Sequence, residues 1–239
     1  MDKIYTGLKS LDKHLKICKG DLVVIGGRPA VGKTAFLISL LINLSKSNVK
    51  CKFFSLELYD KELKAKISKA VGDETKTLES VFSNTIFDDE MSLTKEKLEN
   101  GIDEKVDVVI IDYLQLIGEN RHTTKDKIKM LKEIAKQKNV VVFVASSISK
   151  VFVNYKHPPK LTAEWLINKK RLWEPFDMGN IDKFIFIDRP DKRLCYDEMF
   201  ANDIKKYVAD LVVVQNKNGA LGSIECGWNK EKWTFYELS

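Results

Sequence analysis

The chain has 239 residues, of which 44% are hydrophobic and 31% charged, proportions that exclude a disordered protein and are typical of a globular one. The formal net charge of +6 permits an acidic partner such as nucleic acid but does not require one. No apolar run reaches the roughly 18–20 residues of a membrane-spanning helix, and residues 1–10 lack the apolar stretch of a signal peptide, so we expect a cytoplasmic protein with no membrane partner.

Short apolar runs rich in β-branched residues recur along the chain and alternate with segments of helical period. The apolar runs span residues 21–27, 52–58, 107–111, 139–145, 183–188 and 210–215. Runs that are apolar at nearly every position are typical of strands buried on both faces of a parallel sheet. The segments of helical period span residues 35–44, 63–71 and 128–135. This alternation predicts an α/β fold, a mostly parallel sheet flanked by helices.

The end of the chain has a different pattern. Asn218 and Gly219 form a typical tight turn between two antiparallel strands, and a further strand-like run at 233–238 follows a polar turn at 229–232. We therefore expect a small antiparallel appendix at the C-terminus. No linker rich in Gly, Ser or Pro interrupts the sequence, so residues 1–239 are expected to form a single domain.

A phosphate-binding loop follows the first apolar run. The pattern GxxxxGK[ST] is filled by Gly27, Arg28, Pro29, Ala30, Val31, Gly32, Lys33 and Thr34. The pattern requires a strand before it and a helix after it, and both are predicted. Backbone N–H groups at the start of the helix would hold phosphate oxygens, Lys33 would neutralise the β- and γ-phosphates, and Thr34 would bind Mg²⁺. The loop predicts binding of a nucleoside triphosphate with Mg²⁺.

Two acidic residues stand at the ends of apolar runs. Asp112 follows the run at 107–111, and parallel strands deliver their carboxyl ends to the ligand edge of a sheet. Asp112 is therefore expected to hold Mg²⁺ through its water shell. Glu57 closes the strand-like run 53–57, and its carboxylate would face the γ-phosphate and orient water if that strand neighbours the strand before the phosphate loop. A surface glutamate after a strand is the alternative.

Further stretches carry a family resemblance. The segments at 6–12, 20–25, 54–57, 111–116 and 217–219, together with the phosphate loop, resemble in order and spacing the C-terminal motor domain of DnaB-type replicative helicases, a branch of the RecA-like ATPases. The resemblance covers essentially the whole chain and implies a RecA-like P-loop core that binds ATP and Mg²⁺. It also implies a hexameric ring with ATP at subunit interfaces and single-stranded DNA in the central channel. It assigns Glu57 as the catalytic glutamate.

Three features depart from the family pattern. Ser147 stands where members carry a glutamine that senses the γ-phosphate. The trans-acting Lys-x-Arg pair is replaced by Gln215 and Lys217, and a lysine at the finger position acts as a point charge without the planar fork of arginine. The N-terminal domain and linker helix of the family are absent from the sequence. We therefore expect either a piece of a longer protein or a stand-alone motor domain.

Two lysine-rich segments, 118–129 and 150–175, follow the third and fourth predicted strands, where the family places its channel-facing loops. The candidate DNA contacts in them are Arg121, Lys125, Lys127, Lys150, Lys156 and Lys160. Aromatic residues are interleaved with the charges of the second segment, a combination that holds single strands without sequence preference. Solvated loops are the alternative. Residues 161–172 could form an amphipathic helix that docks a partner or covers the site.

The sequence thus predicts an ATP-dependent DNA helicase motor domain of the DnaB type. Glu57 would activate water, and Lys33, Thr34 and Asp112 would hold the phosphates and Mg²⁺. Lys217 of a neighbouring subunit would stabilise the transferred phosphoryl group, with Ser147 at the sensor position. The alternative is a nucleotide-binding module with weak or no hydrolysis that assembles with a replication partner, which Gln215 and Ser147 favour and the intact carboxylates oppose.

Overall fold

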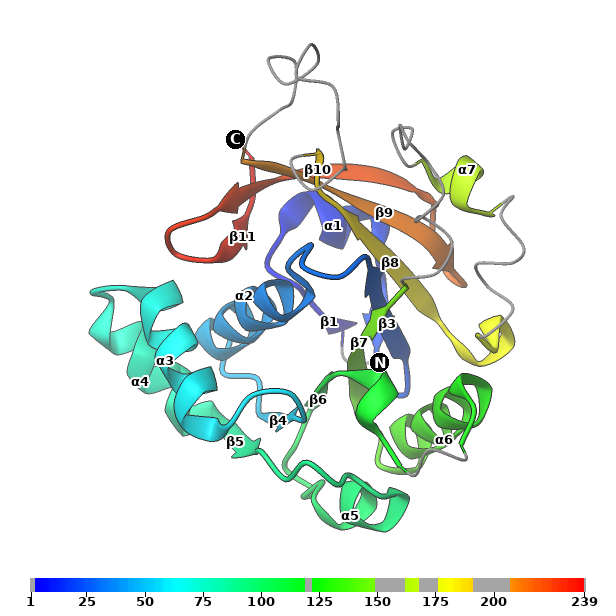
Figure 1. The fold of residues 1–239 in the computed structure, drawn as a ribbon, viewed down its shortest axis with the longest axis horizontal. Helices are drawn as coiled ribbons and strands as arrows, with labels where there is room; N and C mark the ends of the chain where they lie inside the picture. The colour runs from blue at the N-terminus through cyan, green and yellow to red at the C-terminus, as the bar shows by residue number, and fades with distance from the viewer. Residues whose placement is uncertain (1–2, 119–121, 149–161, 168–175, 191–206, 239) are drawn as a thin grey trace.

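The computed structural model describes residues 3–118, 122–148, 162–167, 176–190 and 207–238. Most of the strands in these segments join into one sheet with helices on either side (Figure 1). The strands that pair in parallel are β3 (Leu22–Gly27), β4 (Cys51–Ser55), β5 (Thr85–Asp88), β6 (Val108–Asp112), β7 (Val141–Ser147) and β8 (Lys183–Asp188). The α/β fold and its mostly parallel sheet are confirmed.

The C-terminal strands complete the sheet in antiparallel fashion. They are β9 (Val208–Asn216), β10 (Gly222–Asn229) and β11 (Thr234–Tyr236). The nine-stranded sheet runs β11-β10-β9-β8-β3-β7-β6-β4-β5, and the expected appendix is its β9–β11 end. A separate ribbon pairs β1 (Lys3–Ile4) with β2 (Ile17–Cys18).

Strand β9 joins the parallel part of the sheet to its antiparallel end. The apolar run at 210–215 resembles the runs of the parallel strands, but β9 is antiparallel to both β8 and β10, with Asn216 opposite Lys183 and Asp210 opposite Asp188. The runs are alike because β9 is covered on both faces, since Leu211 and Val212 belong to different hydrophobic clusters. Burial on both faces therefore does not require a parallel strand.

The helices cover both faces of the sheet. They are α1 (Lys9–His14), α2 (Lys33–Lys46), α3 (Asp60–Val71), α4 (Thr75–Asn84), α5 (Lys95–Asn100), α6 (Thr124–Gln137) and α7 (Ala163–Ile167), with short 3₁₀ turns at η1 (Leu114–Leu116) and η2 (Met178–Asn180). Figure 1 shows α2, α3 and α4 on one side of the sheet and α6, in green, on the other. Of the amphipathic helix expected for 161–172, the structure describes α7 within its span, and the rest lies outside the described residues.

Two hydrophobic clusters fill the space between sheet and helices. One packs α2 and α3 onto the sheet and the other packs α5 and α6 onto its opposite face. Helix α2 is buried almost all round, as its apolar sequence predicts. Helix α6 begins with a capping box in which Thr123 and Asp126 bond each other's backbone N–H groups. Among the described residues, no helix is both long and apolar enough to cross a membrane.

Candidate functional site

The phosphate loop joins β3 to α2, as the sequence predicts. A Cβ atom on Gly27 would lie 2.8 Å from Cγ2 of Val31 and 3.1 Å from the carbonyl oxygen of Ile187, so the loop closes too tightly there for any side chain. Gly32 immediately precedes the helix with φ of 100°, a left-handed conformation that favours glycine. The two glycines therefore allow the turn that aims the N-terminus of α2 at the site.

The Lys33 ammonium lies inside this loop. Its Nζ donates hydrogen bonds to the carbonyl oxygens of Gly27 at 3.2 Å and of Arg28 at 2.9 Å. Burial lowers the pKa of Lys33 to about 8, although the nearby carboxylates of Asp112 and Glu57 act in the opposite direction. A cation that has lost part of its hydration gains strongly from an anionic ligand. The environment of Lys33 therefore suits a phosphate group.

Asp112 and Thr34 are brought together beside the loop. Asp112 ends β6, is 3% exposed, and has a side-chain hydrogen bond with Thr34. Burial raises the pKa of Asp112 to about 6, against the lowering effect of the Thr34 bond; Glu57 raises this pKa further and Lys33 lowers it. A hydroxyl and a carboxylate are the oxygen ligands that Mg²⁺ prefers. The two residues fit the expected metal position.

Glu57 reaches the same place although its strand is not a neighbour of β3. Its role is predicted on the condition that its strand neighbours β3, but β7 and β6 lie between β3 and β4 in the sheet. Glu57 still arrives at the site because Ser55 pairs with Asp112 and Leu56 N donates to the Asp112 carbonyl oxygen at 2.8 Å. The side chain is exposed, and its charge affects the pKa of both Lys33 and Asp112. A carboxylate in this position is accessible to water.

Ser147 lies at the carboxyl end of β7, opposite Gly27. A glutamine does stand at this position in space, and it comes from η1. The amide nitrogen of Gln115 donates to Ser146 Oγ at 3.0 Å and to the Ser147 carbonyl oxygen at 3.1 Å, and Ser147 N donates to Gln115 Oε1 at 3.3 Å. Gln115 is part of the 111–116 stretch that carries the family resemblance, but its sequence position gave no sign that it would reach Ser147.

Lys33, Thr34, Asp112, Glu57 and Ser147 line one cavity of about 530 Å³. This volume is within the range of small-ligand sites. Its lining residues are Pro29, Ala30, Gly32, Lys33, Thr34, Glu57, Leu58, Lys66, Asp112, Tyr113, Ser147 and Trp233. The sequence patterns assign no site role to four of them, which are Leu58, Lys66, Tyr113 and Trp233.

The side chains of two residues of the loop pattern, Val31 and Arg28, contact other parts of the protein. Val31 is buried in the core at 1% exposure. Arg28 Nη2 forms an ion pair with Asp188 Oδ1 at 2.9 Å, and the Asp188 side chain is fully buried. Asp188 ends β8, the neighbour of β3. The Arg28–Asp188 pair therefore ties the loop to the adjacent strand.

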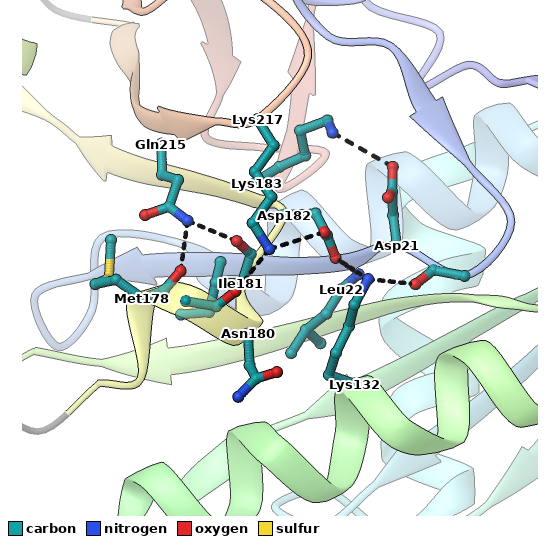
Figure 2. Close-up of polar contacts among 12 residues, drawn as sticks. Asp21, Leu22, Lys132, Met178, Asn180, Ile181, Asp182, Lys183, Gln215 and Lys217 are labelled. Carbon is teal, nitrogen blue, oxygen red and sulfur yellow. Dashed lines mark hydrogen bonds and ion pairs between the residues drawn. The ribbon is translucent and has the colours of Figure 1, made fainter.

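Lys217 does not lie at this cavity. Its ammonium donates to the Gly179 carbonyl oxygen at 2.7 Å and to Asp182 Oδ1 at 3.1 Å, and Figure 2 shows the contact with Asp182. The neighbouring Gln215 amide donates to the carbonyl oxygens of Met178 and Ile181, each at 2.6 Å. Asn216 pairs with the first residue of β8, whereas Gly27 pairs near its end. Lys217 is thus at the opposite edge of the sheet from its own phosphate loop.

Asp182 is the centre of this second polar cluster. Its carboxylate accepts hydrogen bonds from Leu22 N, Lys132 Nζ and Lys217 Nζ (Figure 2). Burial raises the pKa of Asp182, but these donors outweigh burial and hold it below its usual value. The carboxylate is therefore ionised and compensates two lysines.

The structure describes only two of the six candidate DNA contacts. Arg121, Lys150, Lys156 and Lys160 lie outside the described residues. Lys125 is exposed in the first turn of α6. Lys127 differs from the expectation, because it is buried and its Nζ donates to the Gln115 carbonyl oxygen at 2.8 Å. Its burial lowers its pKa, and its ammonium braces the turn after β6.

The sequence is similar to a known protein family and to curated relatives. The sequence model described as the DnaB-like helicase C terminal domain matches residues 3–100 and 74–237. The replicative DNA helicase DnaB of Rickettsia conorii is 27% identical, over 98% of this chain and 57% of the relative. A probable plasmid replicative DNA helicase of Chlamydia psittaci is 25% identical, over 96% of this chain and 54% of the relative. The chain thus spans about half the length of these curated relatives.

Solved structures share the fold. A DnaB-like replicative helicase, described with its interactions with primase, superposes with a TM-score of 0.78 at 18% identity, covering 100% of this chain and 64% of the other. A structure described as an ATPase domain gives 0.77 at 20% identity, covering 99% and 91%. The RadB recombinase gives 0.66 at 16% identity, covering 98% and 99%. The sheet and its helices are therefore those of RecA-like ATPase domains.

Proposed function

Because this chain belongs to the family of DnaB-like helicase C-terminal domains, we propose that it is a motor domain that hydrolyses ATP at subunit interfaces and moves along single-stranded DNA. The observation that carries the proposal is the cavity that gathers Lys33, Thr34, Asp112 and Glu57. A phosphate loop alone would support nucleotide binding. The added carboxylates are the groups that hydrolysis requires.

The binding step follows from the loop geometry. Backbone N–H groups at the N-terminus of α2 point at the phosphates, and Lys33 exchanges its hydrogen bonds to Gly27 and Arg28 for the more strongly attracting phosphate oxygens. Thr34 and Asp112 would hold Mg²⁺, which when bound neutralises charge on the triphosphate. Leaving Asp112 ionised in a buried position is unfavourable, and a bound cation compensates that charge.

The hydrolytic step is assigned to Glu57. Its carboxylate lines the cavity yet remains exposed to solvent, so it can orient a water molecule towards the γ-phosphate and accept a proton from it. Ser147, held by the Gln115 amide, lies in the same lining. We assign Ser147 to sensing the γ-phosphate, with the Gln115 amide holding the Ser147 backbone in position.

Lys217 is assigned to the cavity of a neighbouring subunit. Since it lies at the opposite sheet edge from its own phosphate loop, it can approach a γ-phosphate only in another copy of the chain. The proposal therefore includes a homo-oligomer, a hexameric ring in its assembled form, with a replication protein as a further partner. Single-stranded DNA would pass by the segments that contain Arg121, Lys125 and Lys150, while Lys127 serves to brace the turn after β6.

A second candidate is an assembly module that binds ATP with little or no turnover. The observation in its favour is that Lys217 and Gln215 are both engaged within their own subunit. An ammonium held by Asp182 must leave or share that carboxylate to act on a neighbour. The intact Glu57 and Asp112 speak against this candidate.

Steady-state ATP hydrolysis with and without single-stranded DNA tests the proposal. Wild-type chain should show turnover that DNA stimulates, and Glu57→Gln should reduce it by at least about 100-fold, as expected for loss of a general base. ATP affinity should change little, because Glu57 is not needed to hold the phosphates. Glu96→Gln, an exposed position on α5, is the matched control and should keep full turnover.

Two results would contradict the proposal. Undiminished hydrolysis in Glu57→Gln would remove Glu57 from the reaction. Tight ATP binding without turnover, in the presence or absence of DNA, would favour the assembly module instead.

A further inference from the structure

The cavity around the phosphate loop has an aromatic wall. Trp233 lines it together with Pro29, Ala30 and Thr34, although more than 190 residues separate it from the loop in the sequence. Lys66 of α3 also lines the cavity, and its Nζ lies 4.3 Å from the centroid of the Trp233 ring. A flat aromatic surface with a cation over it therefore borders the space next to the phosphate site.

The backbone at Trp233 is one that a bulky residue seldom adopts. Residues 230–233 connect β10 to β11, with Asn229 paired to Thr234 and Lys232 N bonded to Asn229 Oδ1 at 2.9 Å. Trp233 closes the turn with φ of 59°, the left-handed region in which glycine or asparagine is the usual choice. A tryptophan at this position is disfavoured by the local geometry, which indicates that its ring serves a purpose beyond the turn.

The position of the ring is fixed relative to the phosphate loop. Phe235, two residues further on, donates its N–H to Ser39 Oγ of α2 at 2.9 Å. Its ring packs edge-on against Phe36, with centroids 5.7 Å apart, and a Cβ on Gly32 would lie 3.3 Å from it. The hairpin is therefore anchored on the same helix whose N-terminus forms the phosphate site. A ligand that spans both would meet two preorganised surfaces.

We propose that Trp233 is the platform on which the base of the bound nucleotide stacks, with Lys66 completing this subsite. The inference rests on the proposed function, in which the loop holds a triphosphate. With phosphates at Lys33 and Thr34, the base and ribose must occupy the rest of the cavity of about 530 Å³, and Trp233 is its aromatic lining beside Tyr113. Indole faces stack with any base, so the subsite takes a nucleotide rather than an inorganic phosphate chain.

The test compares two ligands that share their phosphates. Calorimetry measures the binding of ATP and of inorganic tripolyphosphate, each with Mg²⁺, to the wild-type chain and to Trp233→Ala, Trp233→Phe and Lys230→Ala. Trp233→Ala should weaken ATP binding by about 5- to 100-fold, the loss expected for one base–aromatic stack, and should leave tripolyphosphate binding unchanged. Trp233→Phe should fall between. Lys230 lies in the same turn, is exposed and does not line the cavity, so Lys230→Ala should match the wild type.

The outcomes separate this inference from the function beneath it. If the wild type binds both ligands and Trp233→Ala weakens both equally, or weakens neither, the base platform is overturned while nucleotide binding stands. If the wild type binds neither ligand, the proposed function fails and the inference fails with it. Should Trp233→Ala not fold, the ratio of ATP to tripolyphosphate affinity in Trp233→Phe decides, because an unchanged ratio overturns the platform.

Discussion

The folded chain disfavours the ionised form of the Asp112 carboxyl group. Its carboxylate is buried, and its pKa is raised to about 6 because burial disfavours the ionised form. The folded state therefore binds a proton more tightly than the unfolded state, whose carboxyl titrates near 3.8. Stability from this residue is fully present below about pH 4 and falls as the pH rises to about 6. At neutral pH the protein retains an unfavourable charge where the expected Mg²⁺ would lie.

We expect Asp112→Asn to stabilise the fold while it weakens Mg²⁺-dependent ATP binding. The asparagine removes the buried charge but can still bond Thr34, so the free energy of unfolding should rise by ~2–3 kcal/mol at about pH 7. The gain should disappear towards about pH 4, where Asp112 is itself protonated. Urea unfolding across this pH range measures the gain in stability at about pH 7 and its disappearance towards about pH 4. Asp73→Asn, at an exposed position, should change little, and an equal or lower stability of Asp112→Asn at neutral pH would refute the expectation.

The sequence predicted the phosphate-site residues better than the surroundings of individual lysines. Thr34 and Asp112 could be placed together because one follows a loop pattern and the other ends a strand. Lys127 could not be assigned from its charge, since its position one turn before Leu131 puts it against the buried face of α6. The pattern around Trp233 indicates only the start of a strand. Its role as a cavity wall depends on a hairpin folding back over α2, which local sequence does not reveal.

At the scale of elements, the sequence indicated which segments are strands and that the C-terminal ones are antiparallel, but not the order of the strands in the sheet. The buried runs at 183–188 and 210–215 are alike in composition, yet one is parallel to β3 and the other is antiparallel to its neighbours. The separation of β4 from β3 by two strands was also not predictable. Pairing depends on how the crossovers pack, whereas a run of apolar residues reports only burial. The carboxyl ends of the parallel strands nevertheless meet at one edge, which is why the predicted site assembled.

The C-terminal hairpin should contribute strongly to stability through one side chain. Phe235 is 3% exposed and packs against Phe36 and Trp228, with ring centroids 5.7 and 4.9 Å away. Phe235→Ala should lower the free energy of unfolding by about 3–5 kcal/mol, because the cavity left in the core cannot close. Thermal or urea unfolding checks this value.

Leu238→Ala serves as the comparison, since Leu238 is 36% exposed and its truncation should cost less than about 1 kcal/mol. Equal stability of the two variants would show that the hairpin is not anchored through Phe235.

At the scale of the whole molecule, the phosphate cavity and Lys217 occupy opposite edges of one sheet. In the proposed assembly each subunit would receive a lysine from one neighbour and offer its own to the other, a head-to-tail contact. The Asp182 carboxylate holds Lys217 at that edge, and Lys132 of α6 shares it. Asp182 therefore keeps the ammonium near the surface but within its own subunit.

Mixing two inactive variants tests this arrangement. Lys217→Ala and Glu57→Gln should each reduce ATP turnover at least about 10-fold, since trans-acting cations and general bases both contribute more than that. Mixed as dissociated subunits before assembly, they should recover turnover, because roughly a quarter of interfaces then pair an intact Glu57 with an intact Lys217.

Mixtures no more active than the average of the two variants would place the effect of Lys217 within its own subunit. Mass measurement of the assembled species in ATP, alongside the turnover assay, confirms that the two variants share oligomers.

The bond between Phe235 and Ser39 joins residues 196 positions apart, and this has a consequence during synthesis. Synthesis makes β3, the phosphate loop and α2 well before it makes the hairpin that walls their cavity. Until then, the apolar face of α2 that receives Phe235 is uncovered. A nascent chain therefore gains its complete cavity only after Phe235 has left the exit tunnel, and a chain that ends before this residue would expose that helix to aggregation.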